Sequence, residues 1–294
     1  MPLSDAGRGI RFALVAITLF AVQDGISKHL AAHYPVAFFV MIRYWVFAAF
    51  VIALSARAPG GVRAASRTAM PLVQIARGVL LVAQILVIVT SFDLVGLAGT
   101  HAIFALHPLL ATLLAIPLLG EVVGWRRLMA VAVGFAGVIV ILRPGAEVIE
   151  PAALVPLLAA GMFAVYAVLT RMANRADGNS RAAFFYTGVA GAAAITLVGP
   201  FHWTAMTVPD MGWLALLCLT GMSGHYCLIR ALDATEAVRI QPFIYLQMVL
   251  GMAIGWTVFG EAIEPTALIG VAMIVGAGLY AIWREARALR RAAG

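Results

Sequence analysis

The feature that most constrains this chain is a succession of long apolar runs, each about as long as a helix that crosses a bilayer. The stretch from Ala105 to Arg143 shows the design, because two apolar runs meet there at a short polar corner, Gly120 to Arg127. Strands of a membrane β-barrel would alternate in polarity over about ten residues, whereas these runs are continuous. Since lipid cannot hydrogen-bond to the backbone, the runs predict membrane-spanning α-helices.

Composition supports an integral membrane protein. Hydrophobic residues make up 63% of the 294 residues and charged residues 11%, and the mean hydropathy is +1.00. A water-soluble domain is much more polar. We therefore expect an all-α membrane protein whose residues 1–294 form a single membrane domain. The ten predicted transmembrane helices are residues 10–31, 36–56, 71–91, 95–119, 125–143, 152–172, 181–200, 211–231, 237–259 and 264–283.

The basic residues predict how the chain is oriented. With a cytoplasmic N-terminus, sixteen of the 20 Lys and Arg residues fall on one side of the membrane. Only Lys28 and Arg143 fall on the other side, and Arg43 and Arg77 lie inside spans. Because cytoplasmic loops are enriched in Lys and Arg, both termini are predicted to be cytoplasmic. This placement also explains the pI near 10.0 without a nucleic-acid partner.

The design of residues 105–143 returns in residues 245–283, at a constant offset of 140 positions. The pair Gly120-Glu121 then falls on Gly260-Glu261. Each copy holds five spans, an odd number, so the second copy enters the membrane from the opposite side. We predict two inverted five-helix repeats, residues 10–143 and 152–283. This architecture recurs in secondary transporters, which bind substrate near the bilayer midplane.

Specific segments resemble a known family. Leu118–Gly145 resembles the end of the first EamA repeat of the drug/metabolite transporter superfamily, and Gly224–Glu261 resembles the matching part of the second. Arg43 and Arg77 lie where related members carry arginines. Met248 departs from the pattern, because the second repeat often has proline there. The resemblance spans nearly the whole chain and implies ten helices that move small metabolites, and the chain is most similar to YddG-type amino-acid exporters.

Polar side chains inside spans are costly in lipid, so we expect them to face the bundle interior or a water-filled cavity. Arg43 and Arg77 lie about 10 Å inside their spans. Each arginine either holds a substrate carboxylate or ties helices together through backbone carbonyls or an acidic partner. Asp24 and Lys28 are one helical turn apart, so they form an intrahelical ion pair or leave Asp24 to bind an amine or a proton.

Further polar residues gather near the predicted mid-depth of the membrane. Under the 140-residue offset, His101 pairs with Gln241 and His107 with Gln247. These positions fit either interhelical hydrogen bonds or a cavity lining, and histidine titrates near neutral pH, which leaves a proton-coupled step open. The tyrosines within the predicted spans could line the cavity, pack between helices or anchor the helices at the membrane interface. The predicted cavity set is Asp24, Arg43, Tyr44, Arg77, Gln84, His101, His107, Tyr166, His225, Tyr226, Gln241, Tyr245 and Gln247.

Small and helix-breaking residues suggest where helices bend or pack closely. Pro108, Gly224, Gly251 and Gly255 are candidates for hinges or gating, with close helix packing as the alternative. The corner residues Glu121 and Glu261 are expected to cap helices or to pair with basic groups rather than to contact substrate.

Motifs for catalysis and for cofactor binding are absent from the sequence. Lys28 is the only lysine, and no GxxxxGK, HExxH, GxSxG or CxxC motif occurs. We therefore expect no enzyme, no cofactor, no catalytic residue and no metal site.

Together these features predict a secondary transporter that exports amino acids or similar small zwitterionic metabolites across the bacterial inner membrane by alternating access. The alternative is an uptake or exchange permease for an anionic metabolite, either nucleotide-like or a carboxylate. A membrane-embedded enzyme, a scaffold and a passive channel are weaker alternatives. The expected partners are a small-molecule substrate and the lipid bilayer, and both a monomer and a homodimer remain open.

Overall fold

The computed structural model describes residues 3–121, 124–142, 151–178, 180–234 and 237–292. Some side chains within these ranges are not described, chiefly those of residues 3–6, 237–242 and 288–292. The described residues form α-helices and two short 3₁₀ helices, with no strand. The helices are α1 (Leu3–Ala31), α2 (Val36–Arg57), α3 (Gly61–Ala65), α4 (Pro71–Phe104), α5 (His107–Leu119), α6 (Trp125–Leu142), α7 (Leu154–Asp177), α8 (Arg181–Thr196), α9 (Val208–Ala234), α10 (Ala237–Phe259) and α11 (Pro265–Ala292), with η1 (Pro151–Ala153) and η2 (Gly199–His202).

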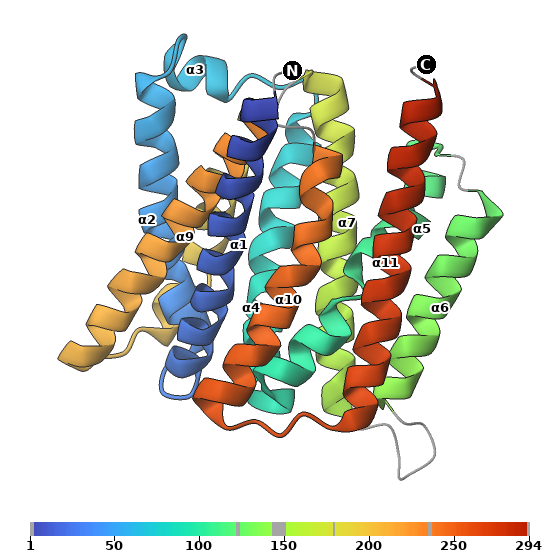
Figure 1. The fold of residues 1–294 in the computed structure, drawn as a ribbon. Coiled ribbons are helices and arrows are strands. Elements are labelled where there is room, and N and C mark those ends of the chain that lie inside the picture. Colours follow the sequence, from blue (N-terminus) through green and yellow to red (C-terminus); the bar gives the residue numbers. More distant parts are fainter. Residues whose placement is uncertain (1–2, 122–123, 143–150, 179, 235–236, 293–294) are drawn as a thin grey trace.

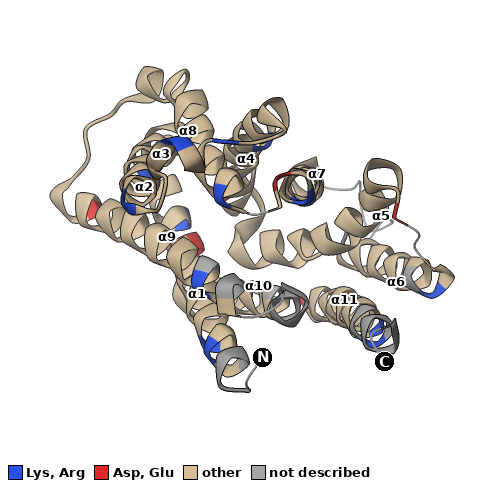
Figure 2. Cartoon of the chain, turned by 90° about the horizontal axis from the view of Figure 1, so that it is seen from above, with Lys and Arg blue, Asp and Glu red and all other residues tan. Residues whose placement is uncertain are grey.

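The helices form one bundle in which most run roughly side by side (Figure 1). Both chain termini lie at the same end of this bundle, which we call the upper end (Figure 1). Viewed from there, most of the ribbon is uncharged, and Lys and Arg appear at several helix ends, including those of α6 and α7 (Figure 2). The side that faces the cytoplasm stays a prediction.

Five helices in the described part of the chain are long and apolar enough to cross a membrane. They comprise Gly7–Ala31, Val36–Arg57, Pro71–Phe104, Pro151–Asp177 and Pro265–Arg284. Large apolar side chains such as Leu72 and Trp125 are 80% and 68% exposed on the outside of the bundle. Because exposed apolar surface on this scale is unfavourable in water, these faces suit lipid.

Helix α4 contains a sharp break that separates two predicted spans. Gly96 has φ 78° and ψ 165°, a conformation that only glycine adopts easily. Residues 97–119 then lead back to the upper end, where α5 ends and α6 begins (Figure 1). The span predicted as one helix over residues 95–119 is instead two helices, because α4 ends at Phe104 and α5 starts at His107.

Two apolar cores hold the bundle together. One contains Phe39, Met41 and Leu217, all fully buried, and joins α2 to α9. The other contains Leu106 and Ile274 and joins the α4–α5 segment to α11. Each fully buried Leu, Ile or Phe side chain contributes about 1.5–3 kcal/mol when the alternative is water. In lipid, close packing and interhelical hydrogen bonds take over much of this role.

The two Gly-Glu corners have the same local conformation. Gly120 and Gly260 have φ of 64° and 66°. The amide of Glu121 donates to Ala115 O at 3.3 Å, and the amide of Glu261 donates to Gly255 O at 3.0 Å. The α5–α6 corner lies at the upper end and the α10–α11 corner at the lower end (Figure 1). This opposite placement supports the inverted repeat, which stays a prediction.

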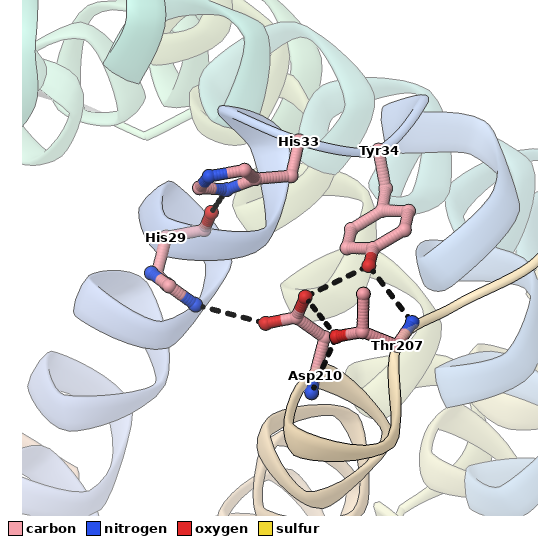
Figure 3. A network of polar contacts seen from close by, with 5 residues as sticks. All are labelled: His29, His33, Tyr34, Thr207 and Asp210. Carbon is pink, nitrogen blue, oxygen red and sulfur yellow. Dashed lines mark hydrogen bonds and ion pairs between the residues drawn. The ribbon is translucent and has the colours of Figure 1, made fainter.

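At the lower end, the turn after α1 is tied to the start of α9 through Asp210 (Figure 3). The Asp210 carboxylate accepts hydrogen bonds from the hydroxyls of Tyr34 at 2.8 Å and Thr207 at 2.7 Å. His29 Nε2 lies 3.1 Å from its other oxygen. The hydrogen bonds from Thr207 and Tyr34, together with His29, lower the pKa of Asp210 to about 2.

Candidate functional site

A cavity lies among α2, α4, α8 and α9, with about 330 Å³ of space when the part open to its surroundings is included. Its lining combines polar, aromatic and aliphatic side chains. The lining residues are Arg43, Tyr44, Phe47, Leu81, Ile85, Thr187, Cys218, Gly221, Met222 and His225.

Arg43 is the positively charged group of this cavity. No hydrogen bond and no ion pair within 4 Å joins its side chain to another residue in the described part of the chain. A guanidinium inside a membrane bundle without an acceptor is costly, and its planar donors match a carboxylate or phosphate. Gly221 lines the same wall, and a Cβ added there would lie 3.6 Å from Arg43 Nε. Arg43 is therefore the candidate anion-binding residue.

An aromatic wall stands beside Arg43. The His225 ring lies 4.8 Å from the Phe47 ring and 5.0 Å from the Phe20 ring. The Tyr44 and Phe47 rings meet edge to face at 6.4 Å. Gly191 gives Tyr44 its place, because any Cβ there would collide with the tyrosine ring. Such a wall accepts flat aromatic groups by stacking or edge contacts.

Arg77 lies outside this cavity and has its donors filled by the protein. It is 2% exposed, and its Nε donates to the Thr170 hydroxyl at 3.0 Å. One terminal nitrogen donates to Ala183 O at 2.6 Å and the other to the Thr187 hydroxyl at 3.0 Å. The Tyr166 hydroxyl accepts a further bond at 3.3 Å. Arg77 thus ties α4 to α7 and α8. This is the structural role that the sequence left open beside binding of a substrate carboxylate.

Asp24 and His101 form a second polar cluster with Gln247. His101 Nε2 lies 3.4 Å from Asp24 Oδ2, and the Gln247 amide donates to the same oxygen at 3.3 Å. The intrahelical ion pair expected between Asp24 and Lys28 is not what the structure shows. Lys28 pairs instead with Glu261, because the α10–α11 corner brings that carboxylate to the end of α1.

Both corner glutamates pair with basic groups, as expected. Glu121 accepts a hydrogen bond from Arg175 at 2.6 Å and lies 3.6 Å from Arg171. Glu261 pairs with Lys28 and also accepts the amides of Leu97 at 2.8 Å and Ala98 at 2.7 Å. Glu261 therefore caps the short helical segment that follows Gly96.

The remaining predicted site residues lie apart from the cavity. His107 is buried, with Nδ1 3.0 Å from Phe104 O and its ring 4.7 Å from the Phe163 ring. Gln84 and Tyr245 are buried on α4 and α10. Tyr226 is 43% exposed on α9 and points away from the cavity lining. The side chain of Gln241 lies outside the described residues.

The candidate hinge glycines are close-contact positions, in keeping with the close-packing alternative, and a role as hinges stays a prediction. A Cβ at Gly224 would lie 2.7 Å from the Phe20 ring, and one at Gly251 would collide with His101. A Cβ at Gly255 would lie 2.9 Å from the amide nitrogen of Ala98. None of the three has a positive φ. Pro108 lies in the first turn of α5, a position that does not require its missing N–H.

Sequence reasoning missed Phe47 and Thr187 in the cavity, and Gly96 at the chain reversal. Phe47 is one of 15 phenylalanines in an apolar chain, so no sequence signal separates it from lipid-facing ones. Gly96 did carry a signal, because only three residues separate the two spans predicted over 71–91 and 95–119. A reversal in so few residues favours a glycine with positive φ.

Comparison with known protein families assigns the chain to one of them. The model of the EamA-like transporter family matches residues 7–143 and again residues 151–283. The chain belongs to this family. It is therefore a multi-pass membrane transporter, in agreement with the predicted class.

Curated relatives of this transporter include S-adenosylmethionine and riboflavin transporters. A S-adenosylmethionine uptake transporter of Rickettsia bellii is 26% identical over 290 residues, 96% of each chain. Riboflavin transporters of Brucella anthropi and Rhizobium johnstonii are 27% and 30% identical, over 86% and 78% of this chain and 91% and 76% of theirs. The names of these relatives do not support the predicted amino-acid export.

A solved crystal structure shares the fold. Its TM-score with this chain is 0.63 at 20% sequence identity, and the match covers 98% of this chain and 99% of the other. At this identity the likeness extends to the fold alone.

Proposed function

We propose that this chain is a secondary transporter that takes up a metabolite with a flat heteroaromatic ring and an anionic group. S-adenosylmethionine is the first candidate. The observation that carries the proposal is the guanidinium of Arg43, which has no hydrogen bond to a described residue and lies beside the aromatic wall of the cavity. This reading replaces export of small amino acids and is close to the predicted alternative, uptake of an anionic or nucleotide-like metabolite.

The chemistry of the cavity suits such a substrate. A carboxylate would accept two parallel hydrogen bonds from Arg43, while the ring would lie against Phe47 and His225. S-adenosylmethionine has a carboxylate and an adenine, and riboflavin has a flat ring system with a hydroxylated chain. Both named substrates contain a nitrogen heterocycle joined to a hydroxylated group, and the aromatic wall of this cavity suits the heterocycle.

Transport would proceed by alternating access in the bacterial inner membrane. The proposed architecture has ten crossings in two inverted repeats, residues 10–143 and 152–283, with both termini in the cytoplasm. Two family matches on one chain and the opposite placement of the α5–α6 and α10–α11 corners (Figure 1) support this arrangement. Each half would supply one gate around the cavity that contains Arg43.

Counterflow in proteoliposomes tests the substrate. Vesicles loaded with unlabelled S-adenosylmethionine should take up radiolabelled S-adenosylmethionine in a saturable way, and empty liposomes should not. Unlabelled riboflavin, leucine and glutamate serve as competitors. Counterflow of leucine without counterflow of S-adenosylmethionine would contradict the proposal and restore the amino-acid reading. Cells that express the chain should also accumulate the labelled compound from the medium, which separates uptake from export.

A further inference from the structure

Gln23, on α1, carries a buried polar group that the fold does not satisfy. Its side-chain oxygen Oε1 is covered, yet it accepts no hydrogen bond from a described residue. The whole residue is only 6% exposed, whereas its backbone carbonyl accepts the Ser27 hydroxyl at 2.8 Å. A buried amide oxygen without a donor is costly inside a membrane bundle. Such an oxygen suits a ligand that brings its own donor.

Gly221 of α9 brings this oxygen next to Arg43. Gly221 lines the cavity, and a Cβ added to it would lie 2.9 Å from Gln23 Oε1 and 3.6 Å from Arg43 Nε. One acceptor and one donor therefore flank the same point of the cavity wall without bonding to each other. Gln23 itself is not a lining residue, but the terminal torsion of a glutamine side chain is soft. A turn about that torsion brings the oxygen to a ligand in the cavity.

Gln23 and Arg43 lie at the same depth in the bundle. Gln23 is about two helical turns before the end of α1, and Arg43 is about two turns after the start of α2. Both of these helix ends lie at the lower end of the bundle (Figure 1). The amide oxygen of Gln23 is nearer to Gly221 than its amide nitrogen, the orientation that the positive charge of Arg43 favours.

The residue after Gln23 adds negative charge to the α1 side of the site. Asp24 lies within electrostatic range of Arg43. Its carboxylate turns towards α4 and α10, where His101 Nε2 is 3.4 Å away and the Gln247 amide donates at 3.3 Å. Asp24 therefore contributes charge to the cavity rather than contact, and Gln23 is the α1 side chain that offers an acceptor there.

We propose that Gln23 is a specificity-determining residue that binds the ammonium group of a substrate with a free amino-acid end. Arg43 holds the carboxylate of that end, and Gln23 Oε1 accepts a hydrogen bond from the ammonium group beside it. This inference rests on the proposed function, because it takes Arg43 as the carboxylate partner. It narrows the substrate class to metabolites with an α-amino acid group, which S-adenosylmethionine has and riboflavin lacks.

The compactness of an amino-acid end explains why both residues are needed. Its ammonium and carboxylate groups are attached to one carbon, so their two partners must lie close together. An ammonium group so close to Arg43 is repelled, and the Gln23 oxygen and the charge of Asp24 offset that repulsion. The sulfonium of S-adenosylmethionine has no hydrogen-bond donor, and the face of an aromatic ring such as Phe47 attracts a cation of this kind. Each charged group of the substrate then has a partner of its own.

A matched pair of competitors tests this recognition. S-adenosylhomocysteine and its analogue with hydrogen in place of the amino group both lack the sulfonium charge and differ in the amine alone. Each compound is titrated against counterflow of radiolabelled S-adenosylmethionine in proteoliposomes. In wild type the deamino analogue should inhibit about 10- to 100-fold more weakly, the range for a hydrogen bond to a charged group.

Substitutions on α1 and α9 assign this preference to Gln23. Gln23→Met keeps the length of the side chain without the amide oxygen, so the ratio of the two inhibition constants should fall to about one. Gln23→Glu keeps an oxygen acceptor and should retain the preference. Gly221→Ala puts a Cβ 2.9 Å from the Gln23 oxygen, which displaces the amide and should weaken the preference. Gly212→Ala, on the same helix with open space around its Cβ, is the control and should leave the ratio unchanged.

The ratio separates recognition from folding. Loss of packing lowers the amount of folded transporter but not its preference between two competitors, so an unchanged ratio in Gln23→Met would overturn the role of Gln23. If Gln23→Met does not fold, an unchanged ratio in Gly221→Ala has the same meaning. Counterflow of S-adenosylmethionine with equal inhibition by the two competitors in wild type overturns this inference alone. Absence of that counterflow contradicts the proposed function itself.

Discussion

Two arginines with similar sequence surroundings have different environments in this transporter. Arg43 faces a cavity and has no hydrogen bond to a described residue, whereas Arg77 is saturated by α7 and α8. The side chains that settle the difference, Thr170 and Thr187, are 93 and 110 residues from Arg77 along the chain. The sequence predicted how deep each arginine lies in its span, but it did not predict which side chains hydrogen-bond to Arg77.

Replacement of Arg43 should damage transport and leave the fold intact. A charge-assisted hydrogen bond is worth about 1.5–3 kcal/mol, so Arg43→Gln should raise the KM for substrate counterflow about 10- to 100-fold. Arg43→Lys keeps the charge but not the planar donors, and should lie between wild type and Arg43→Gln. An unchanged KM in Arg43→Gln would remove Arg43 from the substrate site.

Replacement of Arg77 should act on stability. Arg77→Gln removes the guanidinium that donates to the Ala183 carbonyl and to the hydroxyls of Thr170 and Thr187, and breaking a buried polar network costs about 3–5 kcal/mol. The variant should melt well below wild type in detergent, as followed by fluorescence-detected size-exclusion chromatography. Arg43→Gln is the matched comparison and should melt close to wild type. Equal melting of wild type and Arg77→Gln would show that the network is not structural.

Asp210 should give the lower end of the bundle an acid sensitivity. Its pKa in the folded protein, about 2, lies below the ordinary value of about 3.9. The stabilisation is therefore complete above pH 4 and is lost as pH falls towards 2. Asp210→Asn should melt earlier than wild type at pH 6, and this difference should shrink at pH 3. A difference that grows on acidification would contradict the assigned hydrogen bonds.

At the scale of elements, most spans were predictable and their internal breaks were not. Hydropathy located α2 at residues 36–57 and α10 at 237–259 within a residue or two of the predictions, because long apolar runs have few alternatives in lipid. The sequence did not predict the break at Gly96 or the one between α4 and α5. Apolar residues continue through both breaks, so only the backbone geometry reveals them.

The corner at Glu261 should hold the lower end together more firmly than the corner at Glu121 holds the upper end. Glu261 caps the Leu97 and Ala98 amides in a half-buried setting, whereas the Arg175 partner of Glu121 is 59% exposed. An exposed pair contributes only about 0–1 kcal/mol.

Hydrogen–deuterium exchange tests this asymmetry. Glu261→Gln should speed exchange in residues 97–104, because Leu97 and Ala98 lose a charged acceptor. Glu121→Gln, the repeat-related change, should leave that segment unaffected. Equal exchange of residues 97–104 in wild type and Glu261→Gln would show that the capping contact does not stabilise the segment.

At the scale of the whole molecule, the cavity lies between helices of the two proposed halves. The offset of 140 residues predicted two related halves, and the family model matches the chain twice. The cavity itself was beyond the sequence, because its walls come from α2 and α4 in one half and α8 and α9 in the other. Tyr44 and His225 were expected in it, while Tyr226, one residue along, faces outward.

Cys218 offers the most direct measurement of the central claim, that this cavity is the water-accessible transport site. The thiol lines the cavity beside Arg43, and Cys227→Ser leaves it as the one cysteine of the chain. A small membrane-impermeant methanethiosulfonate should modify Cys218, and S-adenosylmethionine should slow that modification. Ala205→Cys combined with Cys218→Ser and Cys227→Ser puts the thiol on the exposed connection between η2 and α9, outside the predicted spans, where the reagent should react and substrate should not protect it. If the reagent fails to modify Cys218 from either side of the membrane, the cavity is not water-accessible. If S-adenosylmethionine does not slow the modification, the cavity is not the substrate site.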